Sequence, residues 1–101
     1  MSVRQPIAYN GRAEVSKACT VPIPVKDEDG DAKNLDGLTV TARTLDPDGT
    51  GADATSAAQR TAGSNIADVV FTPDQAGPWV VALYIDSELV EKYVVQAEAA
   101  I

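Results

Sequence analysis

Hydrophobic and polar residues alternate along several short stretches of this chain, which is the pattern of β-strands with one buried face. Residues 38–45 alternate in this way, residues 66–72 do so less strictly, and residues 79–85 form the most apolar stretch. A strand over residues 89–97 follows the last of these after a turn at residues 86–88, which predicts a hairpin. The side chains expected to face inward on two of these strands are Ala67, Val69, Phe71, Trp79, Val81, Leu83 and Ile85.

Residues 20–25 predict one further strand, and its prolines predict where that strand lies. Val21, Ile23 and Val25 alternate with Pro22 and Pro24. Amides two residues apart point to the same neighbour, so both prolines remove donors from one side of the strand. We therefore expect an edge strand that pairs through its other side only.

Two segments lack a clear strand pattern. Asn10-Gly11 is a strong turn signal, which predicts a hairpin or an arm in residues 1–19. Residues 46–65 are rich in turn formers and almost devoid of large side chains. We expect a long polar loop there, and a short helix from Ala54 to Ala62, capped by Asp53, is one form it can take.

Length and composition fit a single all-β domain. A chain of 101 residues suits one modest core, and its hydrophobic fraction of 45% relies on Ala and Val, which favours strands over a helical bundle. Short strands at this spacing indicate an antiparallel β-sandwich. The predicted organisation is an N-terminal arm or hairpin at 1–19, the sandwich at 20–97 and a C-terminal tail at 98–101.

The formal charge of −7, with no histidine, argues against nucleic-acid binding, because phosphate contacts need clustered Lys and Arg. The same charge disfavours anionic membrane surfaces, and the longest apolar run is too short to span a bilayer. Cys19 is the only cysteine, so neither an internal disulfide nor a cysteine metal site is possible. We expect a small buried thiol, with an intermolecular disulfide as the alternative.

An acidic stretch at residues 25–37 raises the question of metal binding, because it holds five carboxylates. Calcium loops need oxygen ligands at positions one, three and five, glycine at six and a bidentate Glu at twelve. Counted from Asp27, position six is Ala32 and position twelve is Leu38; counted from Asp46, position twelve is Ala57. We predict a solvated turn and no metal site, with weak calcium binding left open.

No set of residues fills the roles of an active site. A histidine base is missing from the sequence, and the adjacent Ser16 and Lys17 would point to opposite faces of an extended segment. Residues 49–54 satisfy a loose dinucleotide-binding pattern, but the aspartates around them would face the pyrophosphate. We therefore predict no catalytic residues, no cofactor and no enzyme activity.

Three aromatic side chains are candidate contact residues. Trp79 lies on the inward face of its predicted strand and is expected in the core, whereas Tyr84 lies on the opposite face and is an interface candidate. Tyr93 fits either place.

The order of turns and strands resembles a known family of domains. The resemblance rests on residues 25–42, with an Asp-rich turn and a Leu-Asp-Gly lead into an alternating strand, and on residues 67–73 and 76–86, where a turn precedes an aromatic strand. It is similar to the small immunoglobulin-like domains of tailed-phage virion proteins, of the capsid-decoration or the baseplate and fibre type. In that family the turn before the aromatic strand is Pro-Gly-like. One departure is Gly77-Pro78-Trp79, since the family more often has glycine directly before the aromatic residue.

The resemblance implies an immunoglobulin-like sandwich with a non-enzymatic structural role in the virion, assembled in the host cytoplasm. Because the sequence runs from Met1 to Ile101, we expect a free-standing capsid decoration or accessory subunit that docks on the major capsid protein. A tail, neck or baseplate component is the rival within this class, and self-association is left open. A cellular carbohydrate- or calcium-binding module is the alternative from another class.

Overall fold

The computed structural model describes residues 7–49 and 52–99, and all regular structure in those residues is β-strand. The described part holds no helix that is long and apolar enough to cross a membrane. The strands are β1 (Ile7–Glu14), β2 (Cys19–Pro24), β3 (Val40–Leu45), β4 (Ala52–Gln59), β5 (Ile66–Phe71), β6 (Gly77–Ile85) and β7 (Glu88–Glu98).

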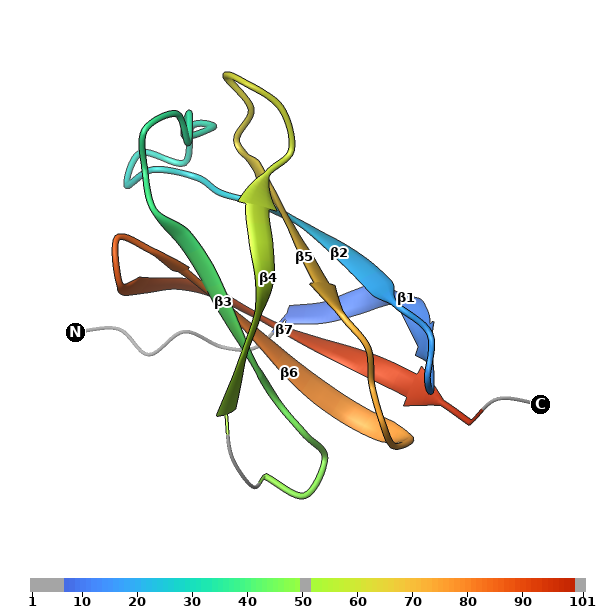
Figure 1. Cartoon of the computed structure of the whole chain (residues 1–101). Coiled ribbons are helices and arrows are strands. Elements are labelled where there is room, and N and C mark those ends of the chain that lie inside the picture. The colour runs from blue at the N-terminus through green and yellow to red at the C-terminus, as the bar shows by residue number, and fades with distance from the viewer. Residues whose placement is uncertain (1–6, 50–51, 100–101) are drawn as a thin grey trace.

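The strands pack as two layers that share one strand (Figure 1). Their order is β1-β7-β6-β3-β4-β5-β2, and every neighbouring pair is antiparallel except β1 with β7, which is parallel. β4 pairs with β3 through Ala52–Thr55 and with β5 through Ser56–Gln59, so it passes from one layer to the other. The predicted β-sandwich is confirmed.

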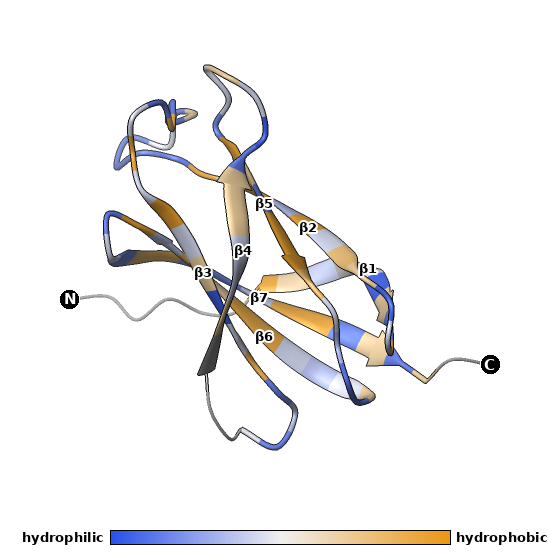
Figure 2. Ribbon diagram, viewed as in Figure 1, coloured by the Kyte–Doolittle hydropathy of each residue, from blue (hydrophilic) through white to orange (hydrophobic). Residues whose placement is uncertain are grey.

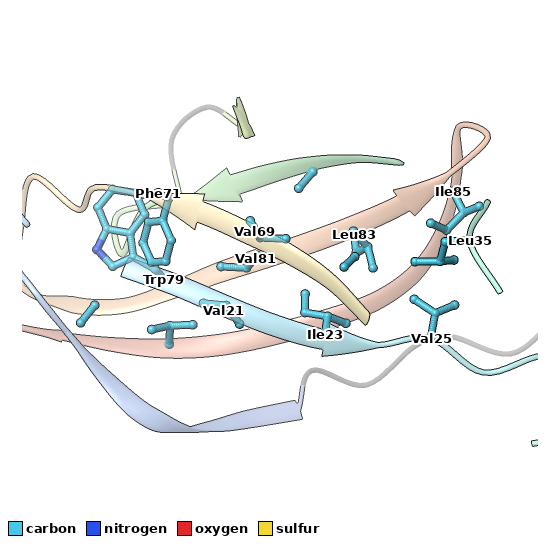
Figure 3. Close-up of a cluster of buried hydrophobic side chains, with 14 of the residues drawn as sticks. Val21, Ile23, Val25, Leu35, Val69, Phe71, Trp79, Val81, Leu83 and Ile85 are labelled. Carbon is cyan, nitrogen blue, oxygen red and sulfur yellow. The ribbon is translucent and has the colours of Figure 1, made fainter. Parts of the chain in front are cut away.

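The space between the layers is filled by the alternating apolar side chains of the strands (Figure 3). All seven side chains expected to face inward are buried. The Trp79 ring packs against Phe71 with 5.7 Å between centroids, and its indole N–H donates to the carbonyl of Gln75. Because this bond satisfies the polar atom of Trp79, the ring can be buried at little cost, as its inward position predicted.

β2 is an edge strand, as its prolines predict. Pro22 lies opposite Asp68 on β5. Just after the strand, the amide of Val25 points toward the same neighbouring segment and donates to the carbonyl of Asn65 at 2.8 Å. The amides of Val21 and Ile23 share this parity and face β5, which leaves both prolines on the outer side. The edge therefore lacks the donors that a stray strand would need.

The predicted helix from Ala54 to Ala62 is wrong, because residues 52–59 are strand β4. Side chains from Ala54 to Gln59 alternate between exposed and half-buried, which is a period of two rather than 3.6. Alanine favours helices in isolation, but here the backbone of β4 pairs with two neighbours and its small side chains fit the crossing. The long polar loop is accordingly replaced by two turns around a strand.

The predicted hairpin at Asn10-Gly11 is also wrong, since both residues lie inside β1. Ile7 and Ala8 pair with Tyr93 and Val94, whereas Arg12 pairs with Gln96, so the register with β7 shifts between them. A Cβ on Gly11 would come within 2.5 Å of the Tyr9 ring. Because Gly11 has no side chain, the Tyr9 ring can lie directly against its backbone within this irregular strand. Residues 7–14 therefore belong to the sheet rather than to an arm.

At the C-terminal end β7 extends through Glu98, one residue beyond the expected end of the sandwich. The rest of the expected tail lies largely outside the described residues.

Candidate functional site

The acidic turn, residues 26–33, is a tight reversal of the chain after β2. Lys26 pairs with Ala32 in an isolated antiparallel bridge, and the amide of Asp27 donates to the carbonyl of Asp31. The Asp27 carboxylate accepts the amides of Asp29 at 2.9 Å and Asp31 at 3.0 Å, and Gly30 adopts φ +86°. Side-chain acceptors and a left-handed glycine are what a compact turn requires, so these residues turn the chain.

The same turn gathers three exposed carboxylates. Candidate ligand oxygens of Asp27, Asp29 and Asp31 lie within 4.8 Å of one another. The calcium-loop pattern fails at its sixth and twelfth positions, so counting residues against that pattern missed this gathering. Part of the Asp27 carboxylate is already engaged by amides of its own turn.

An open groove lies between the acidic turn and the β6–β7 hairpin, with a volume of about 500 Å³. Val25, Leu38 and Ile85 contribute apolar surface to it, while Asp86 and Glu88 stand on the hairpin side. The Asp86 carboxylate accepts the amide of Thr39 at 2.9 Å and so ties the hairpin to the start of β3. The groove is a feature of one end of the sandwich and is open to solvent.

Asp36, another acidic residue at this end, connects its own turn to the turn that follows β4. Its Oδ1 accepts the Gln59 side-chain amide at 2.9 Å and the backbone amide of Gly63 at 2.8 Å. These hydrogen bonds, led by that of Gly63, hold the pKa of Asp36 below its usual value. Beside it Leu35 is buried, and its amide donates to Ser64. The acidic residues at this end therefore fix turn geometry.

The outward side of the β3-β6-β7 layer has a different character. We call it the β6 face, and it comprises the outward positions Thr41, Arg43, Leu45, Val80, Ala82, Tyr84, Leu89, Lys92 and Val94. Cross-strand pairs place Val80 beside Leu45 and Val94, and they place Tyr84 beside Leu89. No position of the β6 face carries a carboxylate. β6 therefore has apolar residues at outward as well as inward positions. Part of β6 is orange in Figure 2, and the rest of the strand is paler.

The remaining candidates fall into place individually. Tyr84 is half-buried on the β6 face, where sequence reasoning put it. Tyr93 is half-buried and packs against the core; burial, and to a lesser degree Glu91, raises its pKa. Cys19 is half-buried at the start of β2, and burial raises the pKa of its thiol, which disfavours the reactive thiolate.

The weak catalytic and cofactor patterns gain no support from the fold. Ser16 lies in a turn with φ +73°, and Lys17 pairs with Glu14 at 3.1 Å. The glycine pattern at residues 49–54 leads into β4 rather than into a helix, and residues 50–51 lie outside the described residues. A phosphate-binding helix N-terminus is thus missing from the described part of that segment.

Comparison with known proteins supports the fold. No family model and no curated protein matches the chain. Among solved structures, the chain is similar to the filamin domain of Lin-41, with a TM-score of 0.59 and 15% sequence identity over 86% of this chain and 82% of that chain. The chain therefore has the immunoglobulin-like β-sandwich fold, and the predicted fold class is confirmed apart from its helix. At this identity the likeness concerns the fold alone.

Proposed function

We propose that the chain is a non-enzymatic binding module that docks on other proteins through its outer surfaces, and that it serves as an accessory subunit of a phage particle, most simply a capsid decoration. The observation that supports docking is the β6 face, where Val80, Tyr84 and Val94 point away from the core. Apolar side chains gathered on one outward sheet face are typical of a surface that a partner covers.

The interior supports the same proposal. The buried cluster is apolar, with Thr44 the one buried polar residue among those described. The immunoglobulin-like fold, shared with a filamin domain, is one that carries binding surfaces on its sheets and loops. The assignment to a virion comes from the turn-and-strand resemblance at residues 25–42 and 76–86.

Purified particles test this proposal. Mass spectrometry of virions should detect the chain, and particles made without it should assemble with tails but lose surface knobs or head stability in electron microscopy. Tailless or non-adsorbing particles would instead assign it to the tail, neck or baseplate. Its absence from particles would overturn the virion role.

Calcium binding is a second candidate, favoured by the three carboxylates of the acidic turn within 4.8 Å of one another. Calorimetric titration of the protein with calcium, and separately with a glycan panel, tests this alternative. A stoichiometric heat that disappears in Asp29→Asn would replace docking as the first function. The turn amides bonded to Asp27 would be kept in that variant.

A further inference from the structure

We propose that the groove between the acidic turn and the β6–β7 hairpin binds a basic segment of a partner protein, in which an arginine or lysine is flanked by apolar side chains. The inference goes beyond the proposed docking through the β6 face, because the groove lies at one end of the sandwich (Figure 1). The two surfaces adjoin, since Leu89 belongs to the β6 face and also lines the groove.

The first argument is the apolar surface of the groove. Among the described residues, apolar side chains from three segments line it: Val25, Leu38, Ile85, Leu89 and Val90. Val25 and Ile85 are buried in the core, whereas the other three are half-buried. Apolar surface in a concave site is stabilised when a partner removes it from water. At about 500 Å³ and open to solvent, the groove suits a side chain that a larger partner presents.

The second argument is an irregularity of β7 at the groove. Successive side chains of a regular strand point to opposite faces, yet Glu88, Leu89 and Val90 all line the groove. The register with β6 shifts between Leu83 and Tyr84, and Val90 is the extra residue of this bulge. Bulges redirect side chains and are common next to functional sites. One short segment thereby gives the groove a carboxylate and two apolar residues.

The third argument is the charge of the groove. Carboxylates outnumber lysines among its lining residues, which include Asp27, Glu28, Asp29, Asp86 and Glu88 with Lys26 and Lys33. Both lysines belong to the acidic turn, whereas the hairpin contributes Asp86 and Glu88 and no lining cation. One oxygen of Asp86 accepts the amide of Thr39, and the second oxygen of a carboxylate can pair with a cation. The charge that fits the hairpin wall is therefore positive.

The fourth argument is that both walls are fixed within the chain. The amide of Asp86 donates to the carbonyl of Thr39 at 2.9 Å, in addition to the bond from the Thr39 amide to the Asp86 carboxylate. On the opposite wall, the amide of Lys33 donates to the carbonyl of Val25 at 3.0 Å. A preformed site loses little conformational entropy when a partner binds.

These features together define the chemistry of the occupant. A nucleic acid or an acidic protein would bring negative charge against Asp86 and Glu88. A neutral occupant would cover these carboxylates without pairing them, which is unfavourable. The aliphatic part of an arginine or lysine can lie on Leu38, Leu89 and Val90 while its charged end pairs with the hairpin wall.

Peptide probes test the charge directly. The ¹⁵N-labelled protein is titrated with the blocked peptide Gly-Ser-Leu-Arg-Leu-Ser-Gly and with the same peptide carrying citrulline, a neutral isostere, in place of arginine. We expect the arginine peptide to shift amide signals of residues 37–39 and 85–90 and to bind about fivefold more tightly than the citrulline peptide at low salt. The difference should shrink in high salt. Equal binding of the two peptides, or no shift at the groove, would overturn the inference.

Matched charge variants locate the cation. Asp86→Asn combined with Glu88→Gln removes both charges of the hairpin wall and keeps an oxygen for the amide of Thr39. This double variant should weaken binding of the arginine peptide about fivefold. Asp48→Asn combined with Asp74→Asn makes the same charge change in the turns that follow β3 and β5, at the opposite end of the sandwich, and should leave binding within about twofold. Equal loss in both double variants would overturn the inference.

Truncation of apolar side chains separates the groove from the β6 face. Leu89→Ala should weaken binding severalfold, because it removes apolar contact area without a change of charge. Val94→Ala, a truncation on the β6 face outside the groove, should leave binding within about twofold. Each variant is first checked for a dispersed amide spectrum. Equal loss in both variants would assign the peptide to the β6 face and overturn the inference.

The particle assay keeps the two proposals distinguishable. If virions hold the chain but the arginine peptide does not bind the groove, the inference fails and the proposed function stands. If the peptide binds the groove while virions lack the chain, the inference stands and the proposed function fails. Shifts at the groove that grow with protein concentration in the absence of peptide would mean that a second copy occupies it, and would overturn the choice of a separate partner.

Discussion

The two outward faces of the sandwich are built on the same core but differ in what they present. On the β2-β5 side, Pro22 and Pro24 stand on the edge strand and Asp68 is held by Arg60 through two hydrogen bonds of 2.9 and 3.1 Å. On the β6 face, the outward positions of β6 and its neighbours hold Tyr84 beside the apolar residues Val80, Leu89 and Val94.

This difference shows that the inward and the outward positions of a strand are selected for different reasons: the inward ones for core packing, the outward ones for what the surface contacts. Inward positions of both layers are similar, since Val21, Val69, Val81 and Leu83 are all fully buried. The core does not constrain the residue types at outward positions, so these residue types indicate whether a surface faces solvent or a partner. Prolines and an ion pair occupy the outward side of β2 and β5, whereas apolar side chains and Tyr84 occupy the β6 face, on which the proposed docking rests.

Neighbouring residues on β6 give the largest expected contrast. Leu83→Ala removes a fully buried side chain and should lower the free energy of unfolding by about 2–5 kcal/mol. Tyr84→Ser, one residue further and outward, should cost less than about 1 kcal/mol while it weakens partner binding. Urea denaturation of both variants measures this. Equal destabilisation would show that Tyr84 belongs to the core and would weaken the comparison.

Removal of the two prolines on the edge strand β2 should have the next largest effect. Changing Pro22 and Pro24 together to Thr restores two outward amide donors while the amides that face β5 are kept. We expect self-association through the edge, seen as concentration-dependent sedimentation, with monomer stability changed by about 0.5 kcal/mol or less. A strictly monomeric variant would mean that the prolines do not guard this edge.

The ion pair on the same side should matter less. Arg60 and Asp68 are both partly exposed, with side-chain exposures of 45% and 25%. Asp68→Asn should lower the thermal midpoint slightly, because exposed pairs contribute little after screening, and the difference should shrink in high salt. A loss as large as that of Leu83→Ala would contradict a surface role for the pair.

The smallest expected effect is confined to acid and concerns Asp36. Its folded-state pKa is lowered from 3.8, so its hydrogen bonds stabilise the fold fully above the unfolded value and this contribution is lost as pH falls through the lower folded value. Asp36→Asn should therefore flatten the loss of stability below about pH 4. Denaturation midpoints at several pH values measure it, with the exposed turn residue Asp74→Asn as the control.

The architecture could be predicted from the sequence wherever alternation was clear. Alternation identified β3 and, less strictly, β5, and the most apolar stretch identified β6. The prolines located the edge at β2. The helix expected at 54–62 failed because alanine-rich residues take their structure from the strands they pair with. The hairpin at Asn10-Gly11 failed because a strong local turn signal was outweighed by pairing with the distant β7.

The candidate surfaces were harder to predict than the fold. Alternation within one strand predicts that Tyr84 is outward, but the pattern does not predict its cross-strand neighbours Thr41 and Leu89. Arg43 and Lys92 become neighbours of Ala82 only through the registers of β3 and β7, which include a shift between Leu83 and Tyr84. Single-strand patterns contain no information on such registers, so the charge of the β6 face emerges only from the folded sheet.

The most direct test is a cryo-electron microscopy structure of the chain on its assembled particle. The account predicts that the β6 face, with Val80, Tyr84 and Val94, lies against the partner, while Pro22 and Pro24 face solvent. A bound chain whose β6 face points into solvent would contradict it.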